Sequence, residues 1–347
     1  MATPDLTVHG AGIFGLSIAW TALQRGATVR VVEAARIGAG SSGGIVGALA
    51  PHVPENWNSK KAFQLDCLLG AENWWAQVQS AGGTDPMYAR TGRLQPIADE
   101  AALALAHARA DTAKTLWQGR ADWQIIPTTG SAWEPHSLSG WLIHDTLTAR
   151  LHPRAACAAL VAAITAKGGE IILGDAPPTT GSQVWATGYA GLLDASHGRT
   201  RPIGTGVKGQ AAALQYNAAT LPQIFTDGLH IIGHGDGTVA IGSTSERDWT
   251  DPTSTDAQLD TLIAKARAAL PCLATAPVAE RWAGIRPRSR SRAPMLGAWP
   301  DRPDHFIANG GFKIGFGMAT GVAACMVDLV LDGRDTIPDD FRIAASI

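Results

Sequence analysis

The sequence predicts an α/β fold with two sheets, a parallel one near the N-terminus and an antiparallel one in the second half of the chain. An apolar run from Leu6 to Val8 leads into the turn HGAGIFG, a helical pattern follows, and a second apolar run ends at Glu33. From residue 207 to 244 the period changes to that of strands, punctuated by Gly, Asp and Asn. A chain of 347 residues can form two domains, each with its own core.

The first turn has the spacing G-x-G-x-x-G at Gly10, Gly12 and Gly15, between a predicted strand and a predicted helix over 13–24. The first glycine allows a tight turn, the second lets the backbone approach a pyrophosphate, and the third lets the helix pack closely on the strand. The helix N-terminus adds free N–H donors and a positive dipole end. The sequence therefore predicts a dinucleotide site.

A second parallel strand is predicted over 28–32, and Glu33 ends it about 20 residues beyond the glycines. A carboxylate in that place accepts hydrogen bonds from ribose hydroxyls. It would repel a 2′-phosphate, so NADP is disfavoured. These residues leave FAD and NAD as equal candidates.

Composition limits the class of partner. The chain is 46% hydrophobic and 17% charged, which is typical of a globular protein. Its net charge of −2 provides no bulk basic field for nucleic acid or anionic lipid, so small metabolites are the expected partners.

The four cysteines indicate a reducing location. Cys67, Cys157, Cys272 and Cys325 form no C-x-x-C pair, so no metal site, dithiol motif or disulfide framework is predicted. The N-terminus shows no export signal, and a cytoplasmic location is expected. The apolar run over 315–331 contains Asp328 and is short, so a buried helix is expected rather than a membrane span.

The remaining pattern alternates helices with strands. Pro153 stands in the first turn of one predicted helix. Further helices are predicted at 60–79, 101–117, 154–167, 255–270 and 315–331, and strands at 170–173, 184–188, 278–285 and 306–308. The small residues of 38–52 can let backbone approach a flat ring, and a glycine pair at 310–311 opens the last helix toward an anion or a polarised carbonyl.

Several segments together resemble the FAD-dependent D-amino-acid oxidase superfamily, most closely glycine oxidase of thiamine biosynthesis, over nearly the whole length. They are HGAGIFG with Glu33, SSGGIVGALAPH at 41–52, VKGQ at 207–210, IGST at 241–244, WAGIRPRSRSRAPMLG at 282–297 and NGGFKIGFGMATG at 309–321. The resemblance implies a Rossmann-like FAD-binding domain formed by 1–85, 146–205 and 300–347. It also implies an interwoven α+β substrate domain with an antiparallel sheet, formed by 86–145 and 206–299.

The resemblance also implies which residues hold FAD. Ile13 and Phe14 would contact the pyrophosphate through backbone, Glu33 and Ala34 would hold the ribose, and Ser41 and Ser42 would bind phosphate or its waters. The other implied contacts follow the flavin or close over it, and they are Val46, Gly47, Ala48, Leu49, Gly188, Gly310, Gly311, Phe312, Lys313, Ile314, Gly315 and Phe316.

Three residues are implied near the substrate. Arg286 matches the family arginine that binds the substrate carboxylate, a task that suits a planar fork with two parallel donors. Lys313 is either a cation near substrate or dioxygen, or a helix-start lysine turned to solvent. His230 stands where glycine oxidase has a tyrosine, and is either a substrate contact or a satisfied sheet histidine.

The chain departs from the family in two further places. The connection over 174–183 is short where relatives have a β-meander, so the adenine-side contact there is not carried over. Ser291 replaces a common acid, and Arg288, Arg290 and Arg292 add charge at alternate positions after Arg286. These arginines form either a strip that recognises an acidic or dicarboxylic substrate, or a solvated basic loop. The sequence favours the loop, since Pro287 is expected to interrupt the alternation.

The implied activity is oxidative deamination of a small amino acid or amine that bears a carboxylate. A hydride passes from the substrate Cα to the flavin, the imine hydrolyses, and dioxygen becomes hydrogen peroxide. Two alternatives stay open: a dehydrogenase that passes electrons to a quinone or a protein, and an FAD-binding protein without turnover. A homo-oligomer is also possible, because relatives are often tetrameric.

Overall fold

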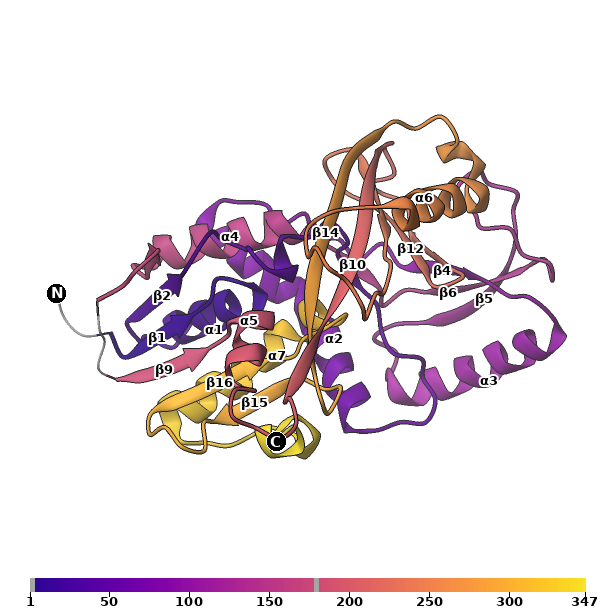
Figure 1. The fold of residues 1–347 in the computed structure, drawn as a ribbon. Helices are drawn as coiled ribbons and strands as arrows, with labels where there is room; N and C mark the ends of the chain where they lie inside the picture. The colour runs from indigo at the N-terminus through magenta and orange to yellow at the C-terminus, as the bar shows by residue number, and fades with distance from the viewer. Residues whose placement is uncertain (1–3, 178–180) are drawn as a thin grey trace.

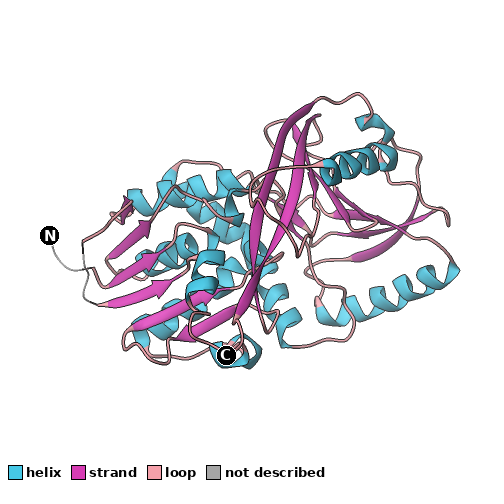
Figure 2. Cartoon of the chain, in the orientation of Figure 1, coloured by secondary structure: helices cyan, strands magenta, loops and turns pink. Residues whose placement is uncertain are grey.

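The computed structural model describes residues 4–177 and 181–347, and their fold is α/β as expected. Two large sheets dominate it, one of six strands and one of eight (Figures 1 and 2). The two halves of the molecule lie side by side, and the long strands β10 and β14 run between them (Figure 1). Residues 178–180 of the short connection over 174–183 lie outside the described residues.

The six-stranded sheet has the order β15-β16-β9-β1-β2-β8, parallel except for the antiparallel β15–β16 pair. Its strands are β1 (Leu6–His9), β2 (Val29–Glu33), β8 (Glu170–Leu173), β9 (Ser182–Trp185), β15 (Met295–Ala298) and β16 (His305–Asn309). The helices of this half are α1 (Ile13–Gln24), α2 (Ser59–Gly82), α4 (Pro153–Ala166), α5 (Gly188–Asp194) and α7 (Gly315–Asp332). Buried apolar side chains of β1, α1 and α7, among them Val8, Leu16 and Val322, form its core.

The predicted elements of this half are confirmed, most with small shifts at their ends. The helix over 13–24 and the strand over 170–173 have the bounds that the sequence predicts. The strand predicted over 184–188 begins at Ser182 and ends at Trp185, because Gly188 already starts α5 with a positive φ of 58°. β15, which falls in the segment assigned to the substrate domain, pairs instead with β16 in this sheet.

Two glycines of the first turn are required by packing. Gly10 has φ +104°, and a Cβ there would lie 2.5 Å from the carbonyl oxygen of Ala186, which follows β9. A Cβ on Gly15 would lie 1.9 Å from the carbonyl oxygen of Gly10. Any side chain at either position would therefore force the turn away from the sheet.

The eight-stranded sheet has the order β14-β10-β13-β12-β11-β4-β6-β5, and it is antiparallel except where β11 lies parallel to β4. The strands are β4 (Arg93–Pro96), β5 (Trp123–Pro127), β6 (Trp141–Asp145), β10 (Gly204–Gln215), β11 (Gln223–Thr226), β12 (Leu229–Gly233), β13 (Thr238–Gly242) and β14 (Val278–Ser289). α6 (Ala257–Ala269) buries Leu259 and Ile263 against it, and α3 (Glu100–Leu116) packs beside β5. The antiparallel sheet predicted from residue 207 onward is confirmed.

The expectation that Pro287 interrupts the alternation of the arginines is wrong for Arg288. β14 continues to Ser289, and Pro287 pairs with Gly206 of β10. Proline is accepted because β14 is the edge strand of the sheet, where a residue facing outward needs no N–H for the ladder. Its carbonyl faces the same way and accepts a hydrogen bond from Phe312 N at 3.0 Å.

α7 is the helix whose length and composition would allow it to cross a membrane. In the structure it packs against α1 and α2, and Met318, Val322 and Met326 are fully buried. A core helix of a globular domain has the same composition, and α7 is packed as such a helix.

Candidate functional site

The turn after β1 lies where the strand order reverses. β1 is flanked by β2 on one side and by β9 on the other, so the chain leaves β1 for one half of the sheet and returns later to the other half. Ligands of open α/β sheets bind outside the carboxyl ends of the strands at such a point. α1 and α7 both begin at this edge, and a Cβ on Gly311 would lie 2.9 Å from the Phe14 ring. The two glycine-rich helix starts are therefore neighbours.

The acid at the end of β2 is held against the first turn. The Glu33 carboxylate accepts hydrogen bonds from Ala11 N at 2.9 Å and Ala35 N at 3.0 Å. Ser42 Oγ accepts from Ile13 N at 3.0 Å, so this hydroxyl already takes one of the free donors of α1. The hydroxyl proton of Ser42 remains available to donate to a phosphate. Glu33, Ser42 and the N-terminus of α1 thus lie together as the sequence predicts.

The segment expected along the flavin is fixed from three sides. β3 (Ala48–Leu49) pairs with β7 (Ala149–Arg150), and Gly47 O accepts from Leu151 N at 3.1 Å. A Cβ on Gly47 would lie 1.8 Å from the carbonyl oxygen of Leu151, so only glycine fits there. The fully buried His234 lies with Nε2 2.9 Å from Ile45 O, and its burial lowers its pKa to about 4.

The loop before α7 is attached to both sheets. Asn309 Oδ1 accepts from Gly310 N at 2.7 Å, and Asn309 Nδ2 donates to Gly188 O at 2.8 Å. Gly310 and Phe312 have positive φ, 76° and 43°. Together with the bond from Phe312 N to Pro287 O, these contacts place the glycine-rich loop between the start of α5 and the arginine-bearing strand β14.

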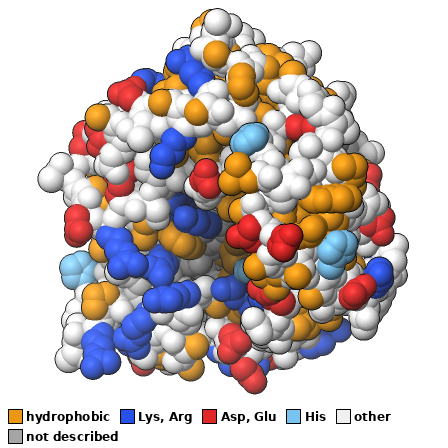
Figure 3. Space-filling model, turned by 90° about the vertical axis from the view of Figure 1, so that its right-hand side faces the viewer, with side chains coloured by type: hydrophobic (Ala, Val, Ile, Leu, Met, Phe, Trp, Pro, Cys, Tyr) orange, Lys and Arg blue, Asp and Glu red, His pale blue; other side chains and the backbone are white. Residues whose placement is uncertain are grey.

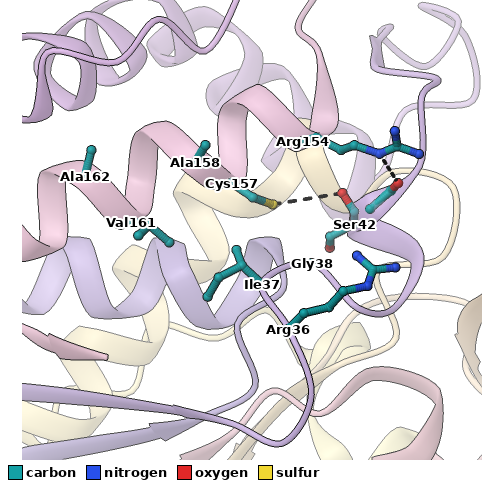
Figure 4. Close-up of a pocket in the computed structure, with 10 residues that line it drawn as sticks. Arg36, Ile37, Gly38, Ser42, Arg154, Cys157, Ala158, Val161 and Ala162 are labelled. Carbon is teal, nitrogen blue, oxygen red and sulfur yellow. Dashed lines mark hydrogen bonds between the residues drawn. The ribbon is translucent and has the colours of Figure 1, made fainter. Parts of the chain in front are cut away.

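A cavity of about 360 Å³ lies between α4 and the loop that carries Ser42 (Figure 4). Arg154 Nε donates to Gly43 O at 2.7 Å, and Cys157 Sγ lies 3.9 Å from Ser42 O, so α4 supports that loop. The residues lining the cavity are Arg36, Ile37, Gly38, Ser42, Gly43, Arg154, Cys157, Ala158, Val161 and Ala162. Of the predicted site residues, Ser42 lines this cavity, and Arg286, Lys313 and His230 do not.

Arg286 is buried on β14, and one of its two terminal nitrogens is hydrogen-bonded within the protein. Its Nη2 donates to Ser243 Oγ at 2.7 Å and to Thr244 O at 2.9 Å. Its Nη1 is buried and has no hydrogen-bond partner among the described residues. A buried charged donor without a partner is costly, so this nitrogen indicates where an acceptor binds. Burial lowers the pKa of Arg286 to about 10, which leaves it cationic at neutral pH.

The neighbouring strand makes room for this guanidinium. A Cβ on Gly209 of β10 would lie 1.6 Å from Arg286 Nη2 and 2.3 Å from its Cζ. Behind Thr244, the Glu246 carboxylate accepts hydrogen bonds from the Thr244 hydroxyl and from Gln210 Nε2, the latter at 3.1 Å. Sequence reasoning did not single out Gly209, Ser243 or Glu246 as site residues, although a lone glycine within a strand signals close approach.

Two more predicted residues lie at the same place. Arg288 and Lys313 both lie against the Phe312 ring, and partial burial together with the charges of Arg286 and Arg288 lowers the pKa of Lys313. Burial, Arg93 and Lys313 lower the pKa of His230 to about 3, so its imidazole is neutral at physiological pH. His230 Nδ1 is buried without a partner among the described residues, so the expectation of a satisfied sheet histidine is wrong.

Basic side chains gather along one side of a hollow on the face that Figure 3 shows, with acidic side chains across it. Arg288 is half-buried on β14, while Arg290 and Arg292 beyond the strand are exposed. Only Arg286 and Arg288 of the four alternating arginines therefore lie within the sheet.

The expected FAD fits these residues. The glycine turn, Glu33 and Ser42 would hold the dinucleotide end, and the segment over 45–49 and the loop over 310–316 would hold the other end, next to Arg286. The backbone N–H groups at the start of α7 are donors of the kind that a flavin ring accepts. The contacts of all these residues with FAD, including those of Ala34, Ser41 and Val46, remain predictions.

Comparison with known proteins identifies relatives. The model of the family described as "FAD dependent oxidoreductase" matches residues 5–329. The chain is 34% identical over 134 residues to glycine oxidase of Pseudomonas aeruginosa, a match covering 38% of this chain and 36% of that protein. Glycine oxidase of Bacillus licheniformis is 23% identical over 360 residues, covering 94% of this chain and 93% of that protein.

The fold is also that of a solved relative. The structure of glycine oxidase from Geobacillus kaustophilus superimposes with a TM-score of 0.80 at 19% identity, covering 97% of this chain and 96% of that one. This likeness shows the fold and extends over both sheets.

Proposed function

Because the chain belongs to the family of FAD-dependent oxidoreductases, we propose that it oxidises a small amino acid or amine that carries a carboxylate. The enzyme class and the cofactor follow from the family and its glycine oxidase relatives. The choice of substrate rests on the residues around Arg286, and the electron acceptor and the cytoplasmic location are part of the proposal.

One observation supports the carboxylate most strongly. Arg286 Nη1 is buried without a partner among the described residues, while Nη2 of the same group is held by Ser243 and Thr244. A substrate carboxylate supplies the missing acceptor and a countercharge, and charge-assisted bonds of this kind are among the strongest in proteins. The tether to Ser243 keeps the fork in one orientation before substrate arrives.

The other residues orient and tune the reacting group. When bound, FAD supplies the two-electron acceptor for the substrate C–H bond. Arg286 fixes the carboxylate, so the Cα–H has one direction relative to the loop over 310–316, which is an orientation effect. His230 is neutral and its Nδ1 is free to hydrogen-bond the substrate. With cations on several sides, a substrate amine binds more readily in its neutral form, so no protein base is needed.

The electron acceptor separates the proposed oxidase from its main alternative. An oxidase produces hydrogen peroxide with dioxygen as the only acceptor, whereas a dehydrogenase turns over only when a quinone or an artificial acceptor is added. Peroxide release by the purified FAD-loaded protein under air decides between them.

The substrate role of Arg286 is tested by substitution. Arg286→Ala removes at least one charge-assisted bond, worth about 1.5–3 kcal/mol. The apparent KM should rise about 10- to 100-fold while the visible flavin spectrum stays. Arg290→Ala, an exposed residue four positions on, is the control and should change neither. An unchanged KM in Arg286→Ala would remove Arg286 from the substrate site.

A further inference from the structure

The arginine after Pro287 shares the side of the strand that carries Arg286. Arg286 and Arg288 are two residues apart on β14, so both side chains lie on one side of the strand, about 7 Å apart along it. The Arg288 guanidinium carbon lies 5.4 Å from the centre of the Phe312 ring, and Lys313 Nζ lies 5.8 Å from the same centre. Arg288 of β14 therefore borders the loop that carries Phe312 and Lys313.

None of these three cations forms a salt bridge with a described residue. Among the described residues, no carboxylate forms a salt bridge with Arg286, Arg288 or Lys313, and neither Arg288 nor Lys313 makes a side-chain hydrogen bond. Elsewhere in the chain pairing is common, and examples are Arg30–Glu170, Arg93–Asp145, Arg109–Glu55, Arg154–Glu280 and Arg281–Asp260. The charge of the Glu246 carboxylate acts on Arg286, whereas no acid is among the charges that shift the pKa of Lys313.

Holding three like charges together in partly buried surroundings is unfavourable, and the lowered pKa of Lys313 is one sign of it. A single substrate carboxylate at Arg286 leaves Arg288 and Lys313 without an acid in contact. The pyrophosphate of FAD is expected at the N-terminus of α1, so it does not serve Arg288. A further negative charge beside Phe312 would compensate these two cations.

The geometry at Arg288 suits a second carboxylate. Its guanidinium lies over the Phe312 ring, and in that arrangement the N–H groups at its edge remain free for a planar acceptor. Arg286 and Arg288 start about 7 Å apart along the strand, and both side chains are long. Their guanidinium groups can therefore bind two carboxylates that are separated by a few bonds in one molecule.

We therefore propose that the substrate is an acidic amino acid, whose α-carboxylate binds Arg286 and whose second carboxylate binds Arg288, with Lys313 adding charge at the mouth. This inference rests on the proposed function and narrows its substrate class. It also revises the preference for a solvated basic loop, since Arg288 belongs to the strand and only Arg290 and Arg292 are exposed.

The test uses two unreactive ligands of matched length, succinate and butyrate, which differ in one charge. Binding to the FAD-loaded protein is measured by the visible difference spectrum and by calorimetry. Succinate should bind at least 10-fold more tightly than butyrate. Arg288→Met should reduce that ratio to nearly 1 with butyrate unchanged, and Arg290→Met, the matched exposed control, should preserve it.

Turnover gives the second readout. Aspartate and glutamate, tested as both enantiomers, should show higher kcat/KM than alanine, and Arg288→Met should abolish that advantage. This inference is overturned if succinate and butyrate bind equally well, or if Arg288→Met leaves the ratio of their affinities unchanged. In either case, binding of butyrate that depends on Arg286 would still support the proposed function. Failure of every carboxylate to bind and of every amino acid to reduce the flavin overturns both.

Discussion

Gly209→Ala tests whether the site depends on the space that β10 leaves for Arg286. The added Cβ would lie 1.6 Å from Nη2, 2.3 Å from Cζ and 3.0 Å from Nη1 of Arg286, so the guanidinium must leave its place. Alanine suits the backbone of the strand at this position, since Gly209 has no positive φ. The perturbation therefore acts on one side chain.

The expected magnitude follows from the bonds that are lost. Moving the guanidinium breaks the bonds from Nη2 to Ser243 Oγ and Thr244 O, each worth about 1.5–3 kcal/mol for a charged donor. Misplacing a substrate-holding group by about 1 Å costs on the order of 10²-fold in rate. We expect kcat/KM for the amino-acid substrate to fall about 100-fold, with FAD still bound.

A double-mutant cycle identifies the cause. In the Arg286→Ala background there is no guanidinium for the new methyl group to displace, so Gly209→Ala should have almost no further effect on kcat/KM or on the melting temperature. Steady-state kinetics and thermal unfolding of the four proteins complete the cycle. The reasoning is refuted if Gly209→Ala costs as much without Arg286 as with it, or if it leaves kcat/KM of the parent protein unchanged.

Three further outcomes are expected. Gly15→Ala should yield protein without bound FAD, because its Cβ would lie 1.9 Å from Gly10 O; a normal visible spectrum would contradict this. Asp145→Asn should lower the free energy of unfolding by about 3–5 kcal/mol, because it leaves the buried Arg93 without its carboxylate; a loss below 1 kcal/mol in denaturant titration would contradict it. The pKa of His234 is about 4 in the folded protein, below the 6.5 that is usual for a solvated histidine. The unfolded chain thus binds the proton first as the pH falls, and stability should decrease by up to about 3 kcal/mol between pH 6.5 and 4. His234→Asn should flatten that dependence, and an equally steep profile would count against it.

Local pattern was sufficient to predict the nucleotide-binding half. The helix from Ile13 to Gln24 is predicted with its observed ends, since the glycine turn fixes where it begins and apolar spacing shows its buried face. Glu33 and Ser42 contact that turn as expected, because Glu33 ends β2 and Ser42 lies in the loop that follows β2. Each of these features depends on short stretches of chain.

The features that the sequence did not predict depend on pairing between distant strands. Gly209 lies beside Arg286 only because β10 and β14 are paired antiparallel, and residue spacing does not reveal their register. Pro287 was expected to interrupt the alternation of the arginines, and within β14 it does not, because β14 is an edge strand. The unpartnered atoms Arg286 Nη1 and His230 Nδ1 likewise become visible only once the burial of the described residues is known.

The central claim is that this chain oxidises a carboxylate-bearing amine with FAD, and anaerobic reduction tests it most directly. The purified protein is titrated without oxygen with glycine, sarcosine, D-alanine and D-aspartate while the flavin absorbance is recorded. We predict that at least one of them bleaches the flavin, that the bleaching saturates with substrate, and that Arg286→Ala shifts the midpoint to higher concentration. A protein that takes up no FAD, or a bound flavin that no amino acid bleaches, would contradict the account.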